Sequence, residues 1–88
     1  MGTGEASVSV EIRVELKPGI LDAEAESVQR SLGLLGVEGV STVGVARVYT
    51  LVFRGVPAAE AERRARLAVD RLLANPVIHR VAVHSRHG

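Results

Sequence analysis

The sequence predicts an α+β protein: a two-layer ferredoxin-like β-α-β-β-α-β sandwich, with two helices on one face of an antiparallel sheet. One observation behind this prediction is a strictly alternating apolar segment near the N-terminus. The other is a pair of segments with helical periodicity, separated by valine-rich stretches. With 88 residues the chain has room for one hydrophobic core. We therefore expect residues 1–6 to be a disordered N-terminal extension and residues 7–88 to form a single domain.

The first expected element is a strand at residues 7–16, SVSVEIRVEL. Its apolar residues fall at every second position, which is the pattern of a strand with one buried face. Lys17-Pro18-Gly19 then ends the strand, because proline has no N–H to donate and glycine permits a tight turn.

A helix is expected at about residues 23–35, where apolar residues recur at helical spacing. Asp22 is suited to the N-cap, and Glu24 and Glu26 lie favourably in the first turn. Gly36 is suited to the position just past the C-terminal end.

Two consecutive strands are expected in the valine-rich stretch that follows, a short one at about 41–46 and a longer one at about 47–54. Gly44 interrupts the run and favours a bend or bulge between them. In the longer strand Tyr49, Leu51 and Phe53 share one face, and the alternate residues share the other.

A second helix is expected at about 57–74, with Pro57 at its first position. Two Glu-to-Arg pairs four residues apart, Glu60 with Arg64 and Glu62 with Arg66, support it. Asn75-Pro76 stops it, because a residue before proline avoids the helical region. A final strand is expected at 77–85, with His87 and Gly88 frayed.

The apolar pattern also predicts self-association. The strand at 47–54 is apolar on both faces, yet two helices on one side cover only one face of the sheet. An apolar patch on the open face would mark an association site. We expect a homo-oligomer built on that open face or on a strand edge.

Composition excludes several classes of protein. The chain has no cysteine, which rules out disulfides and thiolate metal sites and fits a reducing compartment. The formal net charge of +1 provides no field for nucleic acid or anionic membranes. No apolar run approaches the ~20 residues that span a bilayer, and the N-terminus lacks signal-peptide features. We expect a cytoplasmic protein that binds neither nucleic acid nor membrane.

The residues that carry chemistry do not assemble into a recognisable active site. His79 and His84 are expected on opposite strand faces, which does not suit a metal site. Ser41 and Thr42 have no general base that the sequence places beside them. An acylphosphatase needs an asparagine that orients a water molecule. The single asparagine of this chain, Asn75, is already explained as a helix stop, which disfavours that activity. The aromatic platform of an RNA-recognition module is also missing. We expect no catalytic, cofactor-binding or metal site.

Three segments, in order, resemble the PurS family. Residues 16–22, LKPGILD, are similar to the family's LKxGVLDP. Leu35-Gly36 followed by Glu38-Gly39-Val40 resembles LGYEGV, and residues 72–78, LLANPVI, resemble LLANPVIE. The resemblance covers about residues 8–84. Among the departures, Arg47 stands where the family has lysine, and His79 stands where it has glutamate.

This resemblance implies the small, non-catalytic subunit of phosphoribosylformylglycinamidine synthase, a purine-pathway amidotransferase. Such a subunit self-associates as a dimer or tetramer and joins a PurL-type synthetase to a PurQ-type glutaminase. The complex uses ATP, Mg and glutamine, and none of them is expected on this chain. We expect subunit contacts at these loop residues: Lys17, Pro18, Gly19, Asp22, Arg47, Asn75 and Pro76. The alternative is an ACT-like regulatory domain that binds small molecules between protomers.

Overall fold

The computed structural model describes residues 6–87, without the side chain of His87. The expected disordered extension therefore lies outside the described residues except for Ala6, whose carbonyl oxygen accepts a hydrogen bond from the Gly55 N–H at 3.3 Å. The molecule is elongated, with principal extents of 54 × 32 × 15 Å. Within the described range, no helix has the length and apolar character needed to cross a membrane.

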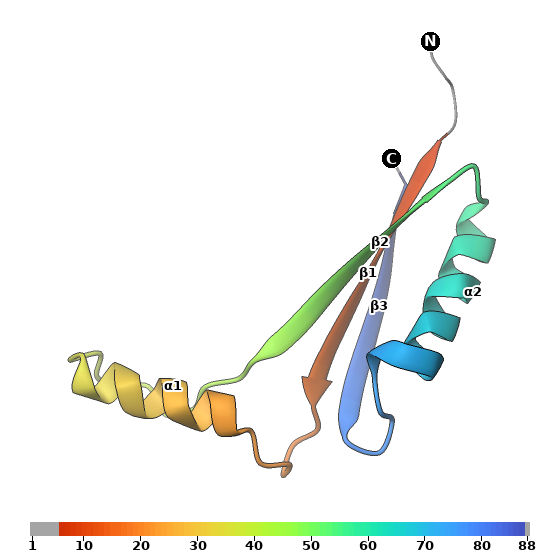
Figure 1. Ribbon diagram of the computed structural model, residues 1–88. Helices are drawn as coiled ribbons and strands as arrows, with labels where there is room; N and C mark the ends of the chain where they lie inside the picture. The colour runs from red at the N-terminus through yellow and green to blue at the C-terminus, as the bar shows by residue number, and fades with distance from the viewer. Residues whose placement is uncertain (1–5, 88) are drawn as a thin grey trace.

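The sheet has three antiparallel strands in the order β2-β1-β3 (Figure 1). They are β1 (Ser7–Leu16), β2 (Ala46–Arg54) and β3 (His79–His87). β1 lies in the centre, and its Ile12 pairs with Tyr49 on β2 and with Val83 on β3. The strand expected at 77–85 therefore begins and ends two residues later, and His87 belongs to it.

The core lies between this sheet and one helix, α2 (Ala58–Ala68). Alternation in β1 places four residues, Val8, Val10, Ile12 and Val14, on the inner face with at most 6% exposure. Ala61 and Ala65 of α2 are fully buried against them. Two small side chains let the helix approach β1 and β3 closely, so each inner residue of β1 is covered.

The second helix follows the expected range with two differences at its ends. Pro57 is the N-cap residue rather than the first helical residue, and its carbonyl accepts the Ala61 N–H at 2.9 Å. After Ala68 the chain widens into one π-helical turn, η1 (Val69–Leu73), closed by the Ala74 N–H on the Val69 carbonyl. Helical structure thus ends at Leu73, shortly before Asn75-Pro76, as expected from the proline.

The first helix, α1 (Ala23–Leu34), has the expected ends but not the expected place. The Asp22 carboxylate caps the Ala25 N–H at 3.1 Å. At the other end, Gly36 has φ 83°, and the N–H groups of Gly36 and Val37 bond back to Gly33 and Leu32 in a Schellman motif. However, α1 projects away from the end of the sheet, and only α2 lies over its inner face (Figure 1).

The short strand expected at 41–46 does not form: residues 41–45 are irregular. β1 is already paired with β2 and β3 along almost its whole length. The β1–β2 ladder ends at Glu15 and Ala46, so the preceding residues lie beyond the sheet. There they run beside α1, where Gln29 Nε2 donates to the Ser41 carbonyl at 2.9 Å. The ferredoxin-like α+β class is confirmed, with these two differences from the expected layout.

Candidate interaction surface

Three segments meet at the end of the sheet where β1 stops and β2 and β3 begin. They are residues 17–22, residues 42–47 and residues 75–79, and we call this region the loop end. Antiparallel pairing brings them together, because the end of one strand lies beside the start of its neighbours. All seven residues expected at subunit contacts belong to the loop end.

A groove of about 630 Å³ separates the first two segments. One wall is the turn at 17–22, in which Gly19 has φ 88°, a conformation that favours glycine. The other wall is the irregular stretch 42–45, and Glu15 and Arg80 lie along the groove at the sheet. Arg80 donates to Glu15 Oε1 from both Nε and Nη2, at 3.1 and 3.0 Å. The turn expected to contact another subunit is therefore open to solvent along this groove.

A second hollow of about 320 Å³ lies next to the groove and reaches the start of β2. Asp22 and Arg47 both line it, together with Tyr49 and His79. Asp22 also borders the larger groove, so the two depressions share the base of α1. The fold thus places Arg47 near the turn that precedes α1, although 25 positions separate Arg47 from Asp22 in the sequence.

The Asn75-Pro76 corner is built by hydrogen bonds centred on Asn75. Its carbonyl accepts the N–H groups of Ile78 and His79 at 3.1 and 2.8 Å. Its side-chain Oδ1 accepts the Val77 N–H at 2.9 Å, and its own N–H donates to His79 Nδ1 at 2.9 Å. Asn75 therefore shapes the corner, while Pro76 lines a cleft of about 440 Å³ beside η1.

The corner and the first turn are joined directly. The Lys17 N–H donates to the Ile78 carbonyl at 2.9 Å, immediately next to the Leu16–His79 pair that ends the sheet. A displacement of the corner would therefore also move the backbone of Lys17. The sequence places His79 on one face of a strand but does not predict its bond to the Asn75 N–H, because that contact depends on the three-dimensional path of the corner.

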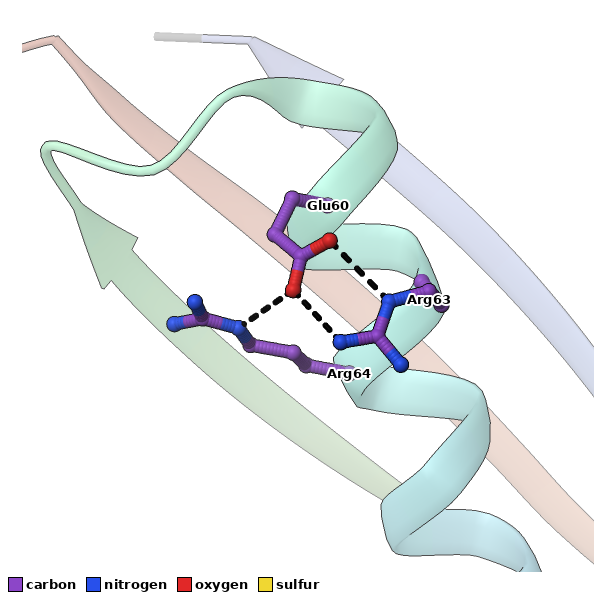
Figure 2. Close-up of polar contacts among 3 residues, drawn as sticks. All are labelled: Glu60, Arg63 and Arg64. Atoms are coloured by element: carbon purple, nitrogen blue, oxygen red, sulfur yellow. Dashed lines mark hydrogen bonds and ion pairs between the residues drawn. The ribbon is translucent and has the colours of Figure 1, made fainter.

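The outer face of α2 carries a separate cluster of charges (Figure 2). Arg63 and Arg64 both donate to the Glu60 carboxylate, at distances between 2.6 and 3.0 Å. The hydrogen bonds from Arg63 and then Arg64 lower the pKa of Glu60 to about 2. Arg66 pairs with Glu62 at 3.0 Å. The expected pairs are confirmed, and each of these arginines is paired within its own helix.

Large exposed apolar side chains gather on and around α1. Leu21 before the helix is 74% exposed, and Leu34 and Leu35 at its end are 88% and 78% exposed. On the open face of the sheet, among the described residues, Val48 and Val52 are the exposed large apolar side chains, at 56% and 58%. The apolar patch expected on the open face is therefore small, and most of the exposed apolar surface lies elsewhere.

Within residues 6–87, no cluster of three metal-binding side chains occurs. Strand register places His79 opposite Leu16 on the inner face and His84 opposite Glu11 on the open face. No described side chain carries a buried polar atom that lacks a hydrogen-bond partner.

The fold and the loop end define a small α+β protein whose distinctive residues lie in solvent-facing turns at one end of a three-stranded sheet. The chain belongs to the PurS family, described as phosphoribosylformylglycinamidine (FGAM) synthase, whose model matches residues 9–87. A relative from Archaeoglobus fulgidus, named phosphoribosylformylglycinamidine synthase subunit PurS, is 34% identical over 83% of this chain and 91% of its own length. A relative of the same name from Methanothermobacter thermautotrophicus is 40% identical over 80% of this chain and 82% of its own.

Solved structures agree with this assignment. PurS from Thermus thermophilus is similar with a TM-score of 0.72 and 34% identity, over 89% of this chain and 95% of its own. A chain in the structure of PurLQS from Thermotoga maritima shares the fold, with a TM-score of 0.80 and 20% identity over 91% of this chain and 98% of its own.

Proposed function

We propose that this chain is the small, non-catalytic subunit of phosphoribosylformylglycinamidine synthase in purine biosynthesis. It bridges a PurQ-type glutaminase and a PurL-type synthetase and supports the transfer of ammonia between them. The observation that carries the proposal is the family match over residues 9–87, which includes every segment of the loop end. A bridging subunit contributes by holding two active sites in position, which needs contact surface rather than catalytic side chains.

Several properties of the loop end suit a surface for partner subunits. Lys17 and Arg47 are exposed and lie beside separate hollows, and neither has an ion-pair partner among the described residues. The turn and the corner that flank these cations are held by backbone hydrogen bonds, so the surface is formed before a partner arrives. Preformed surfaces bind with a smaller loss of conformational entropy. Lys17, Pro18, Gly19, Asp22, Arg47, Asn75 and Pro76 accordingly form or support the contacts to partner subunits.

A second surface suits self-association into a dimer or tetramer. An apolar stripe runs along α1 to its C-cap: Val28 and Leu35 are exposed and Leu32 is half-buried, because none of the described strands packs closely against the helix. The inner face of β2 is also only partly covered, because α2 lies over β1 and β3. Its apolar side chains there are half-buried: Tyr49, Leu51 and Phe53. When α1 of one copy covers β2 of the other, each copy contributes both surfaces. Such a symmetric exchange doubles the buried area of a single contact.

The complex, rather than this chain, uses ATP, Mg and glutamine in this proposal. The synthetase and glutaminase subunits hold those ligands, and the chain itself acts in the cytoplasm, where its cysteine-free sequence needs no oxidising environment.

Reconstitution tests the proposal. The purified chain is mixed with the cognate synthetase and glutaminase, and ATP-dependent product formation is compared with glutamine and with free ammonia as nitrogen donor. Bridging predicts that glutamine supports the reaction only when this chain is present, whereas ammonia supports it without the chain. A glutamine rate that does not respond to the chain contradicts the proposal. A rise in melting temperature with added amino acids would then favour the ACT-like alternative.

A further inference from the structure

The hydrogen bond between the Asn75 N–H and His79 Nδ1 requires one protonation state of the histidine ring. The backbone N–H is a donor, so Nδ1 must act as an acceptor at 2.9 Å. A neutral imidazole has one donor nitrogen and one acceptor nitrogen, whereas both are donors in the cation. The corner is therefore compatible with neutral His79 that carries its proton on Nε2, and not with the protonated ring.

His79 is also at the point where the corner meets the rest of the loop end. It is the first residue of β3 and the last partner of β1 in the sheet. Its backbone N–H donates to the Asn75 carbonyl at 2.8 Å, and the residue before it accepts the Lys17 N–H. The ring lies between two hollows, one beside η1 and one at the start of β2. A change at the ring therefore acts on both turns.

Charged groups face His79 from each element around it. Asp70 and Arg66 line the hollow on the η1 side. The hollow on the β2 side contains Arg47 together with three carboxylates, Glu15, Asp22 and Glu24. A protonated ring thus loses its backbone partner and has carboxylates within the adjoining hollows to which it can turn.

We propose that His79 is a positioning residue of the loop end, which holds the Asn75-Pro76 corner and the Lys17 turn in register while its ring is neutral and releases them when the ring is protonated. Histidine is the side chain that changes charge between about pH 5 and 8. The loop end is then ordered while the ring is neutral and loosened once the ring is protonated. Its consequence for subunit binding rests on the function proposed above, whereas the switch itself belongs to the isolated chain.

Nuclear magnetic resonance on the full, isotope-labelled chain tests the proposal between pH 8 and pH 5.5. We expect the His79 ring to carry its proton on Nε2 at pH 8. As the pH falls, the amide resonances of Asn75 and Lys17 shift with the same midpoint as the His79 ring. At pH 8, His79→Ala raises amide exchange at Asn75 about fivefold, the ratio expected for one lost hydrogen bond.

Two variants separate a titrating ring from a structural one. His79→Gln supplies a neutral acceptor, so the shared midpoint at Asn75 and Lys17 disappears while the fold is kept. His84→Gln removes a histidine from the open face of the same strand and leaves that midpoint unchanged. A ring proton on Nδ1 at pH 8, or an Asn75 amide that does not follow His79, overturns the proposal. Because no partner subunit takes part, this outcome is independent of whether the bridging function holds.

Discussion

The two helices of this small chain differ in what they bury. α2 places alanines against the sheet, and Ala61 and Ala65 reach 0% exposure over the inner residues of β1. α1 has good helix ends, yet Ala25 is its single buried residue, and its leucines and Val28 remain in contact with solvent. One helix therefore stabilises the monomer, whereas the other contributes little to its core. A helix with an apolar stripe usually needs a partner surface to be stable, and the exchange proposed between two copies would supply that surface to α1.

The largest expected effect comes from the α2 half of the molecule, where the core is. Ile12→Ala empties the centre of the inner face, at a side chain with 0% exposure. Loss of a buried isoleucine costs about 2–5 kcal/mol of unfolding free energy, measured by urea titration with circular dichroism. Val52→Ala, on the open face at 58% exposure, is the control and should change the unfolding free energy by about 0.5 kcal/mol or less. Equal effects would contradict the placement of the core.

Close packing of α2 is tested by enlarging a small residue. Ala61→Leu forces the helix away from β1 and is expected to cost about 1–3 kcal/mol of unfolding free energy. Ala59→Leu makes the same chemical change on the exposed side of the same helix. It should leave the unfolding free energy nearly unchanged in the same urea titration. If Ala61→Leu is tolerated equally well, α2 does not pack as closely as described.

Substitutions in and around α1 are expected to change the dissociation constant of the dimer more than the unfolding free energy of the chain. Leu35→Glu places a charge on the exposed stripe and should weaken the dimer at least about tenfold, which corresponds to about 1.4 kcal/mol. Sedimentation equilibrium measures the dissociation constant, and circular dichroism checks that the fold is kept. Leu72→Glu changes an equally exposed leucine in η1 and serves as the control. A dimer weakened by the control but not by Leu35→Glu would place the contact on the α2 side.

Charge reversal at the loop end is expected to affect partner subunits more than the monomer. Lys17→Glu and Arg47→Glu should each weaken binding to the partner subunits several-fold, because charges at an interface mainly set the association rate. Arg54→Glu reverses an exposed charge at the other end of β2 and is the control. Pull-down and titration with the partner subunits provide the measurement. Normal assembly of both loop-end variants would show that these cations are not contacts.

The smallest effect is expected on the outer face of α2. Its two arginines hold the pKa of Glu60 at about 2, below the ordinary 4.5. A depressed carboxyl pKa contributes stability above the ordinary value, and that contribution is lost as the pH falls towards 2. Glu60→Gln should therefore lower the melting temperature slightly at pH 7 and have almost no effect at pH 2. The control is Glu38→Gln, which removes a carboxylate from the exposed loop after α1, away from the arginines of α2.

The sequence predicted strand faces and helix ends, which depend on nearby residues, but not the packing between segments distant in sequence. The alternation in β1 predicted its buried face, and Asp22 and Gly36 predicted both ends of α1. These features depend on neighbours within a few positions. The strand expected at 41–46 does not form, because both edges of β1 are already paired with β2 and β3. The position of α1 was not predicted either, because it depends on contacts between residues distant in sequence.

The same distinction applies to the loop end. Family resemblance identified Lys17, Asp22 and Asn75, and the structure brings their segments together at one end of the sheet. The resemblance to the PurS family is confirmed, while the contact role of each residue stays a prediction. The hydrogen bond of the His79 ring was not predicted, because a bond to a backbone N–H four residues earlier leaves no trace in sequence spacing.

The most direct measurement is a disulfide crosslink between copies. The chain has no cysteine, so single cysteines can be introduced without background. Val28→Cys on α1 and Leu51→Cys on the inner face of β2 are made in two differently tagged chains and mixed under oxidising conditions. Packing of α1 from one copy on β2 of the other predicts a crosslinked pair that carries both tags, and no such pair when Leu72→Cys replaces Val28→Cys. Failure of Val28→Cys to crosslink, or equal crosslinking by Leu72→Cys, would contradict the assignment of α1 to a second subunit.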